Sequence, residues 1–314
     1  PELTLPATGW VDWKWREIDH AIPQDSWIRG IYIKSSNSRV VHHASLWAHI
    51  ESQFQTPLAT AKGHKERADR LIEALRLSTL PVSESDYEEI RNSARIFQIA
   101  DTPDNWELLG ASTPGIAVPI YPESTGKFIP GGAKLRIITH YRTTGRPERE
   151  TPTVGIYFAK KAAQPLRPFT HIVLQNNAFS IPTGARNYKV HGYHLFESDV
   201  TLYGAAPHVH YRGMSMKLTA HLPNGNEQVI FSAPDHQYEF LSFEDRFAHP
   251  ISLPAGTIMV METVFDNSTF NPRNPNASAD RPFGWQLNEE MCWAVLAYTT
   301  RWVEGRAGSL IRSR

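Results

Sequence analysis

Three short segments of similar composition recur along this chain, and they constrain its fold more than any other sequence feature. Each places a proline and a glycine after an apolar residue: Ile129-Pro130-Gly131-Gly132, Ile181-Pro182-Thr183-Gly184 and Leu253-Pro254-Ala255-Gly256. Proline presets φ for a turn and glycine accepts positive φ, so each segment predicts a tight turn that launches a new strand. Their occurrence in both halves of the sequence predicts two all-β halves.

The length and the strand pattern divide the chain near its middle. A chain of 314 residues is long for one domain and suits two domains of about 150 residues each. Pro165 and Pro168 interrupt the strand pattern where the two halves would meet. We therefore predict an all-β fold of two antiparallel β-sandwich domains, residues 1–165 and 166–314.

A helical insertion is predicted within the first domain, over about residues 57–100. Between Pro57 and Leu77, apolar residues recur at helical spacing beside a charged flank. Ser83 and Asp86 resemble a capping box at the start of a second helix. The apolar stripes of these helices must be buried, so a lid, a packing arm and a contact with a partner chain are all open interpretations.

Composition excludes several classes of partner and site. The 32 Lys and Arg residues balance the 32 Asp and Glu residues, so no general field draws the protein to nucleic acid or anionic lipid. Cys292 is the only cysteine, which excludes an intrachain disulfide and a thiolate-rich zinc or iron–sulfur site. No run of about 18 apolar residues occurs, so no membrane span is expected. Any metal must be held mainly by His, Met or carboxylate side chains.

The pair His208 and His210 is the first candidate for a metal site. If this segment is a strand, both imidazoles leave the same face of the sheet, and one metal ion could bind both. Pro207 cannot lie in the middle of a sheet, which places the pair near a strand end. In the alternative interpretation, the two histidines are only polar residues on a solvated strand face.

The doublet His42-His43 and the single His140 supply three further imidazoles. Both motifs follow runs of β-branched and aliphatic residues, which would hold the rings on a rigid scaffold. Adjacent strand residues point to opposite faces, so the doublet can share an ion only where the strand twists or bulges. In the alternative, one ring of the doublet packs in the core and the other faces water.

Four motifs of this chain occur in the order seen in a known enzyme family: Val41-His42-His43, Thr139-His140-Tyr141, His208-Val209-His210 and Glu290-Met291-Cys292. The chain resembles the copper type II, ascorbate-dependent monooxygenases, which include the peptidylglycine α-hydroxylating and dopamine β-monooxygenases. It is still more similar to their bacterial relatives, through Phe265-Asp266-Asn267-Ser268 and the Asn271-Pro272, Asn274-Pro275 loop. The resemblance spans roughly residues 25–50 and 125–300 and leaves the predicted insertion uncovered.

The resemblance implies a fold and two sets of ligands. It implies two jelly-roll-like sandwich domains that carry one copper ion each and face one another across a solvent-filled cleft. By the same resemblance, His42, His43 and His140 would hold an electron-transfer copper. His208, His210 and Met291 would be the catalytic residues, since they would hold the copper that activates dioxygen. Ligand chemistry agrees, because imidazole suits both copper oxidation states and a thioether favours Cu(I).

Other residues compete for these roles. Taken alone, Met291 has the pattern of a core methionine beside a strand, and Met214 and Met216 lie closer to the His pair in sequence. The latter two match no ligand of the family, so we interpret them as packing residues. Three further histidines match nothing in the motif set and are expected at the surface or around the site: His191, His194 and His236.

The positions that would bind substrate depart from the peptide-amidating enzymes. Ala206, Trp293 and Val295 stand where those enzymes have Arg, Asn and Tyr, so the groups that would grip a peptide carboxylate are missing. Ile138 stands two residues before His140, where the family has a Gln. An electron route through that Gln side chain is therefore in doubt. An uncharged, apolar or aromatic small molecule is the expected substrate.

We therefore predict a two-copper monooxygenase that hydroxylates a C–H bond with dioxygen and an external reductant, such as ascorbate or a redox protein. The chain has no Cys-x-x-Cys-His haem motif, so a cytochrome or other redox partner would be separate from it. The resemblance implies an exported, periplasmic setting, and the start at Pro1 is interpreted as that of a mature or trimmed chain. Two alternatives are a non-catalytic copper-binding or electron-transfer protein on the same fold, and a zinc hydrolase, which would lack an obvious general base.

Overall fold

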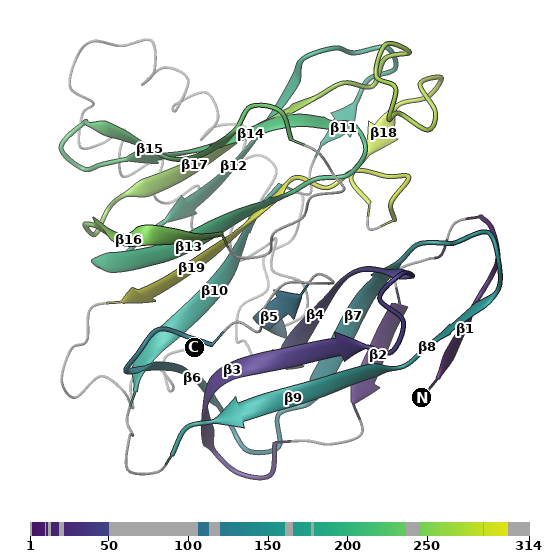
Figure 1. The fold of residues 1–314 in the computed structure, drawn as a ribbon. Helices are drawn as coiled ribbons and strands as arrows, with labels where there is room; N and C mark the ends of the chain where they lie inside the picture. Colours follow the sequence, from purple (N-terminus) through teal and green to yellow (C-terminus); the bar gives the residue numbers. More distant parts are fainter. Residues whose placement is uncertain are drawn as a thin grey trace.

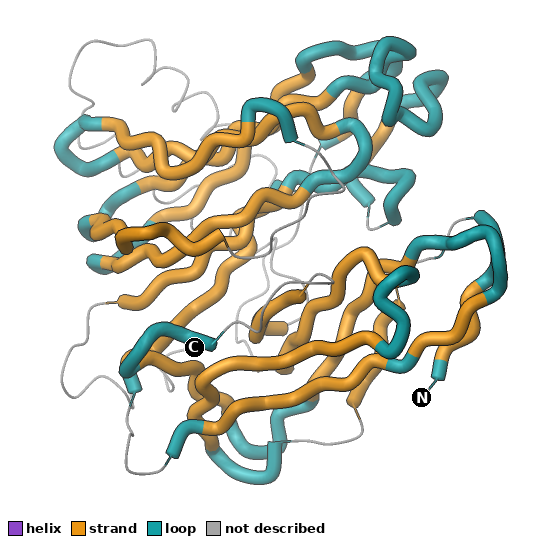
Figure 2. The backbone as a smooth tube through the Cα atoms, in the orientation of Figure 1, coloured by secondary structure: helices purple, strands orange, loops and turns teal. Residues whose placement is uncertain are grey.

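The computed structural model describes residues 2–9, 11, 14–18, 22–49, 106–112, 120–160, 166–176, 179–236, 245–284 and 286–300. Within these ranges the regular secondary structure consists of β-strands, which confirms the predicted all-β class (Figure 2). The strands pair in several sheets that are predominantly antiparallel. The helical insertion predicted over about residues 57–100 lies outside the described residues.

The N-terminal strands form two layers that enclose a core (Figure 1). One layer has the order β2-β7-β4-β5, with β2 (Lys14–Ile18), β7 (Leu135–Tyr141), β4 (Val41–His49) and β5 (Trp106–Ser112). The other contains β6 (Thr125–Ile129), β3 (Ser26–Ser35) and β9 (Pro152–Phe158). Apolar residues of both layers meet between them, including Ile28, Ile31, Leu46, Leu109 and Leu135. The short strands β1 (Leu3–Leu5) and β8 (Glu148–Glu150) pair with each other.

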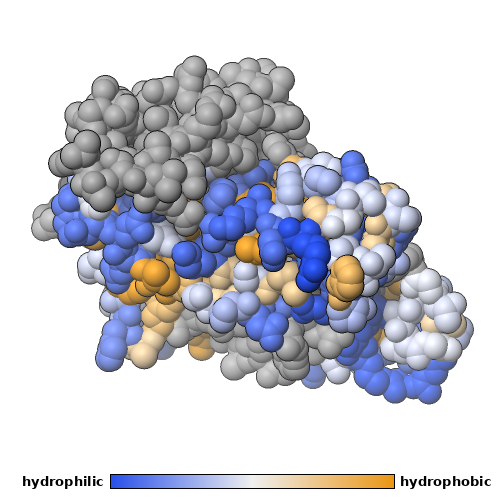
Figure 3. Space-filling view, turned by 90° about the horizontal axis from the view of Figure 1, so that it is seen from above, coloured by the Kyte–Doolittle hydropathy of each residue, from blue (hydrophilic) through white to orange (hydrophobic). Residues whose placement is uncertain are grey.

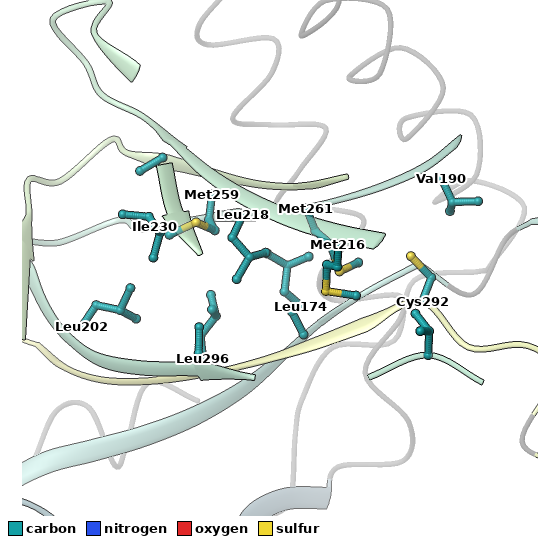
Figure 4. Close-up of a cluster of buried hydrophobic side chains, with 14 of the residues drawn as sticks. Leu174, Val190, Leu202, Met216, Leu218, Ile230, Met259, Met261, Cys292 and Leu296 are labelled. Carbon is teal, nitrogen blue, oxygen red and sulfur yellow. The ribbon is translucent and has the colours of Figure 1, made fainter. Parts of the chain in front are cut away.

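The C-terminal strands form a second pair of layers (Figure 1). One layer has the order β12-β17-β14-β15, with β12 (Tyr188–Leu195), β17 (Ile258–Phe265), β14 (Gly213–His221) and β15 (Glu227–Ala233). The other contains β10 (Arg167–Gln175), β19 (Trp293–Thr300), β13 (Val200–His208) and β16 (Asp245–Leu253). In the core between them, Leu202 and Leu296 lie opposite Leu218 and Met259 (Figure 4). The short strands β11 (Ser180–Ile181) and β18 (Arg281–Pro282) form a separate pair.

One seven-stranded sheet runs through both halves of the chain, in the order β16-β13-β19-β10-β6-β3-β9. The halves join where β10 pairs in parallel with β6, through the partners Arg167–Thr125 and Pro168–Gly126. Because this junction is only two residue pairs long, side-chain packing must supply most of the contact between the halves.

The segment from Met291 through the first residues of β19 provides that packing. Its alternate side chains point to opposite sides of the sheet. Cys292, Ala294 and Leu296 lie in the C-terminal core. Met291, Trp293 and Val295 lie in a second cluster that also contains three residues of the N-terminal half: Trp47, Leu108 and Ile138. We call this second group the interface cluster. The period of two in strand side chains thus makes one segment serve both the C-terminal core and the contact between the halves.

The three predicted Pro-Gly turns are confirmed. Gly132, Gly184 and Gly256 have φ of 82°, 72° and 84°, a conformation that favours glycine. In each turn the following N–H donates to the proline carbonyl, in the pairs Ala133–Pro130, Ala185–Pro182 and Thr257–Pro254. The first and last of these turns lead directly into β7 and β17. They therefore start the strand that bears His140 and a central strand of the C-terminal core.

The visible surface of the described residues is mostly hydrophilic, with apolar side chains in separate small groups (Figure 3). Among the described residues there is no helix of the length and hydropathy that crossing a membrane requires.

Candidate metal centre

Three candidate histidines lie on two neighbouring strands of the N-terminal half. His42 and His43 are on β4, and His140 is on β7 directly opposite His43. The pairing of β4 with β7 shifts register between Val41 and His43. Such an irregularity allows the side chains of two adjacent residues to lie on the same side of the strand. The ring centroid of His43 lies 5.0 Å from that of His42 and 4.3 Å from that of His140. The doublet and the single histidine therefore form one local group.

The other two candidate histidines lie where β13 ends. His208 is the last residue of β13, and the loop through His210 leads into β14. Val209 between them is buried in the C-terminal core, so the two imidazoles point away from that core. Their ring centroids are 5.4 Å apart and the ring planes are perpendicular, with an angle of 90°. The two imidazoles thus lie close together, although His210 stands in the loop after β13 rather than on a strand.

The two groups of histidines meet between the halves of the chain. The ring centroids of His43 and His208 are 5.1 Å apart, and those of His140 and His210 are 5.7 Å apart. One potential ligand atom from each of His43, His140 and His208 lies within 4.8 Å of the other two. This trio takes ligands from both sets that the family resemblance implies, and all five rings are at most 8% exposed. In this conformation the histidines form one buried cluster rather than two sets across an open cleft.

Burial keeps four of these imidazoles neutral near pH 7, those of His42, His43, His208 and His210. It lowers the pKa of His42 and that of His210 from 6.5 to about 4. It lowers the pKa of His43 and that of His208 well below 6.5, and the neighbouring histidines add to the effect. Metal binding requires the neutral imidazole, so these four side chains can accept a cation without first losing protons.

The tautomer of His210 is fixed by a backbone carbonyl. Nδ1 of His210 lies 3.1 Å from the carbonyl oxygen of Glu289, which can only accept, so Nδ1 carries the proton. Nε2 of the same ring is buried and makes no hydrogen bond to any described residue. One ring nitrogen held by a carbonyl and the other left with its lone pair is the usual arrangement of a metal-binding histidine.

A buried ion pair lies directly behind His210, and sequence reasoning missed it. The side chains of Arg212 and Glu290 are both 0% exposed, and Nη1 of Arg212 lies 3.2 Å from Oε1 of Glu290. Glu290 also accepts hydrogen bonds from the backbone N–H groups of His210 and Arg212, at 3.1 and 2.8 Å. Burial raises the pKa of Glu290, and the N–H groups and charge of Arg212 oppose that effect. Both residues stand in or beside motifs of the sequence, but nothing local indicates that they pair.

Met291, the candidate thioether ligand, is fully buried in the interface cluster. Trp293 of the same cluster is 6% exposed, and its ring centroid lies 6.0 Å from that of His208. Trp293 therefore lies beside the histidines and between the two halves of the chain.

The rival thioethers are engaged elsewhere. Sδ of Met214 lies 3.4 Å from Nη2 of Arg273. Met216 packs in the C-terminal core, near Leu174 and Met261 (Figure 4). Met216 thus packs as expected, whereas the sulfur of Met214 contacts a guanidinium rather than a hydrophobic core.

The remaining histidines differ in their relation to the cluster. Nε2 of His191 lies 3.3 Å from a carboxylate oxygen of Glu262, and His194 contacts the ring of Phe196. His236 is 5% exposed, and its charge contributes to the lowered pKa of His208. His236 is therefore within electrostatic range of the cluster, a proximity that its place in the sequence does not indicate.

The donor set is compatible with copper. Neutral imidazoles bind copper in either oxidation state, and they also suit zinc, whereas a thioether distinguishes copper from zinc. The buried Nε2 of His210 and the trio of His43, His140 and His208 supply donor atoms without a carboxylate. These imidazole donors suit copper and zinc alike, and they form one shared trio rather than the two separate ligand sets that the family resemblance implies.

Comparisons with known proteins add no family. No family model and no curated protein matches the chain. A solved structure titled infectious bursal disease virus VP2 subviral particle is 10% identical with a TM-score of 0.22, and the match covers 88% of this chain and 58% of that one. The stem and receptor binding domain of the spike protein P1 from bacteriophage PM2 is 7% identical with a TM-score of 0.16, over 93% of this chain and 98% of that one. This chain thus spans little more than half the length of the first, and similarities this low support no conclusion about fold or function.

Proposed function

We propose that this protein is a copper-dependent monooxygenase that hydroxylates a C–H bond of a small, uncharged organic molecule. The observation that carries the proposal is the convergence of buried imidazoles from both halves, with donor atoms of His43, His140 and His208 within 4.8 Å of one another. In the proposal two copper ions bind per chain, one to His42, His43 and His140 and the other to His208, His210 and Met291. Each pair of layers is taken as a jelly-roll-like sandwich domain, with the division near residue 165.

The residues have separate tasks in this proposal. Bound copper would supply the one-electron chemistry that dioxygen activation needs. One oxygen atom enters the C–H bond and the other leaves as water, so the external reductant must supply the electrons. The interface cluster excludes water from the side of His208 where Trp293 lies. His210 is oriented by the carbonyl of Glu289, which keeps its Nε2 as a donor.

Residues of β13 and β19 support the proposed substrate class. Ala206 and Val295 are register partners of β13 and β19, and neither can pair with a carboxylate. Trp293 presents an aromatic ring beside His208. Charge-assisted hydrogen bonds, worth about 1.5–3 kcal/mol each, are therefore lacking at these positions, and apolar contact would have to hold the substrate.

The second candidate function is copper binding or electron transfer without oxygenation. The observation in its favour is that all five histidines are at most 8% exposed, which leaves little access for a substrate in this conformation. In either case a separate reductant, such as ascorbate or a cytochrome, would deliver electrons, and we propose an exported, periplasmic setting as the resemblance implies.

Oxygen consumption separates the two functions. The copper-loaded, ascorbate-reduced protein is expected to consume oxygen in proportion to a neutral aromatic substrate and to form a hydroxylated product. His208→Ala should abolish this turnover, whereas His171→Ala, which removes a buried histidine of β10 outside the cluster, should not. Copper binding without substrate-dependent oxygen uptake across such compounds would favour the electron-transfer function, and tighter binding of glycine-extended peptides would contradict the substrate class.

A further inference from the structure

We propose that Arg212 and Glu290 are positioning residues, which together hold the imidazole of His210 in the orientation and tautomer that metal binding needs. This inference rests on the proposed role of His210 as a ligand. It concerns a buried ion pair that lies outside the ligand set and that the sequence motifs do not explain.

The dipeptide Glu289-Glu290 holds His210 at two points. The carboxylate of Glu290 accepts the backbone N–H of His210 at 3.1 Å, and the carbonyl of Glu289 accepts the ring Nδ1–H at 3.1 Å. That carbonyl belongs to the peptide unit directly ahead of Glu290, so anchoring the Glu290 side chain also places the carbonyl. The backbone and the ring of His210 are therefore fixed to the same short segment.

Arg212 completes the attachment from the other side of the loop. Its backbone N–H and its Nη1 both donate to Oε1 of Glu290, at 2.8 and 3.2 Å. Nη1 also donates to the carbonyl of Asn288 at 3.1 Å. The loop from His210 to Arg212 and the segment from Asn288 to Glu290 are thus connected by five hydrogen bonds between them.

The polar loop between β17 and β18 supports the guanidinium from behind. Nε of Arg212 donates to Oδ1 of Asn267 at 3.0 Å, and Nη2 donates to the carbonyl of Asn276 at 3.4 Å. Asn267 is itself 0% exposed, and the two N–H groups of its Nδ2 are shared among three carbonyl oxygens at 3.0–3.3 Å, those of Ile181, Pro182 and Ala279. A buried network whose members are all bonded has one low-energy arrangement, so it resists rotation of any single side chain.

A purely structural role would not explain where the pair lies. Exchanging a buried ion pair for apolar residues often costs little stability, so stability alone is a weak reason for burying one. Partners in this outer position typically change metal affinity by 10–100-fold when they are altered. Glu290 contacts the backbone of a candidate ligand, His210, and immediately precedes another, Met291.

The test uses Glu290→Gln in the full chain, with Glu107→Gln as a matched control. Glu107 is the acid of another largely buried pair, 2.9 Å from Nζ of Lys127. In the metal-free protein, nitrogen-15 NMR of the histidine rings should show a single His210 tautomer with the proton on Nδ1. Glu290→Gln should give a mixture of tautomers, and Glu107→Gln should leave the tautomer unchanged. The ring signals that disappear in the variant His210→Asn are assigned to His210.

Copper titration provides the second measurement. Glu290→Gln should weaken the binding of one copper ion about 10–100-fold, while Glu107→Gln binds copper like the wild type. If Glu290→Gln folds with an unchanged tautomer and unchanged copper affinity, the positioning role is wrong. If Glu290→Gln does not fold, Arg212→Lys replaces it in both measurements. This variant keeps the positive charge and loses the planar guanidinium with its several N–H donors. A wild type that binds no copper would refute the proposed function, while the tautomer measurement would still decide the positioning role.

Discussion

Met291 is fully buried among apolar side chains of both halves, so packing and copper ligation predict different effects of substitution. Leucine has a similar volume, and such an exchange usually costs less than about 1.5 kcal/mol of unfolding free energy. Met291→Leu should therefore fold normally but bind Cu(I) more weakly, whereas Met291→His should keep copper and favour Cu(II).

The control for this prediction is Met261→Leu, because Met261 is fully buried in the C-terminal core away from the interface cluster. It should match Met291→Leu in stability, measured by urea unfolding, and match the wild type in Cu(I) affinity, measured by competition with a chelator. Wild-type Cu(I) affinity in Met291→Leu would show that Met291 only packs.

The number of copper ions tests how the histidines are grouped. Wild-type protein should bind two copper ions per chain, and His140→Ala should lose one and keep the ion held by His208, His210 and Met291. Elemental analysis after removal of loosely bound metal measures both numbers. Loss of both ions would mean that His140 and His208 serve one shared site, as their mutual distance in the trio with His43 allows.

At the scale of elements, the turn from β13 to β14 depends on a glycine. A side-chain carbon at Gly213 would overlap Cγ2 and Cβ of Val209, which lies between the two histidines. Gly213→Ala should therefore displace the loop, lower the unfolding free energy by about 1–3 kcal/mol and weaken copper binding. Thermal unfolding and copper titration measure the two effects.

Gly155→Ala on β9 is the matched control, since its added carbon would lie at an ordinary 3.5 Å from Cβ of Tyr32. It should leave both stability and copper binding near the wild type. Equal behaviour of the two alanine variants would show that the close approach of Gly213 to Val209 does not set the position of the loop.

The parts of the fold that sequence predicted are those decided by local chemistry. Positive φ at Gly132, Gly184 and Gly256 follows from turn geometry, and the closeness of His208 and His210 follows from their separation of two residues. The meeting of His43 with His208 was not predictable in this way, because it depends on how two sheets pack rather than on neighbouring residues. The same reason hid the pairing of Arg212 with Glu290, although both lie in or beside recognised motifs.

At the scale of the whole molecule, buried histidines make stability depend on pH. The pKa values of His42, His210 and His236 are lowered from 6.5 to about 4 in the folded protein. Between these two values the unfolded chain binds more protons than the folded one, so stability falls as pH decreases from about 6.5 to about 4. Each such group contributes roughly 1.4 kcal/mol per pH unit inside that window. Above it, this contribution is constant.

Urea unfolding of the metal-free protein at pH 5 and pH 7 measures the effect. The free energy of unfolding should be several kcal/mol lower at pH 5 than at pH 7. His236→Asn should make this difference smaller by the contribution of one histidine. Burial of Glu290 raises its pKa and acts in the opposite direction over the same range, so the His236→Asn comparison decides: an unchanged pH difference in that variant would mean that His236 is not held neutral by burial.

The position of β19 inside the seven-stranded sheet has a consequence for biosynthesis. This strand lies between β10 and β13, so the sheet is incomplete until residues through Thr300 have left the ribosome. His43 and His140 lie on β4 and β7, which pair with each other and can form earlier. His208 lies at the end of β13, and β13 pairs with β19, so its position relative to the first group depends on the last strand. We therefore expect the trio to form only after β19 has inserted, so occupancy of the trio would report that this stretch of the chain has been synthesised and folded.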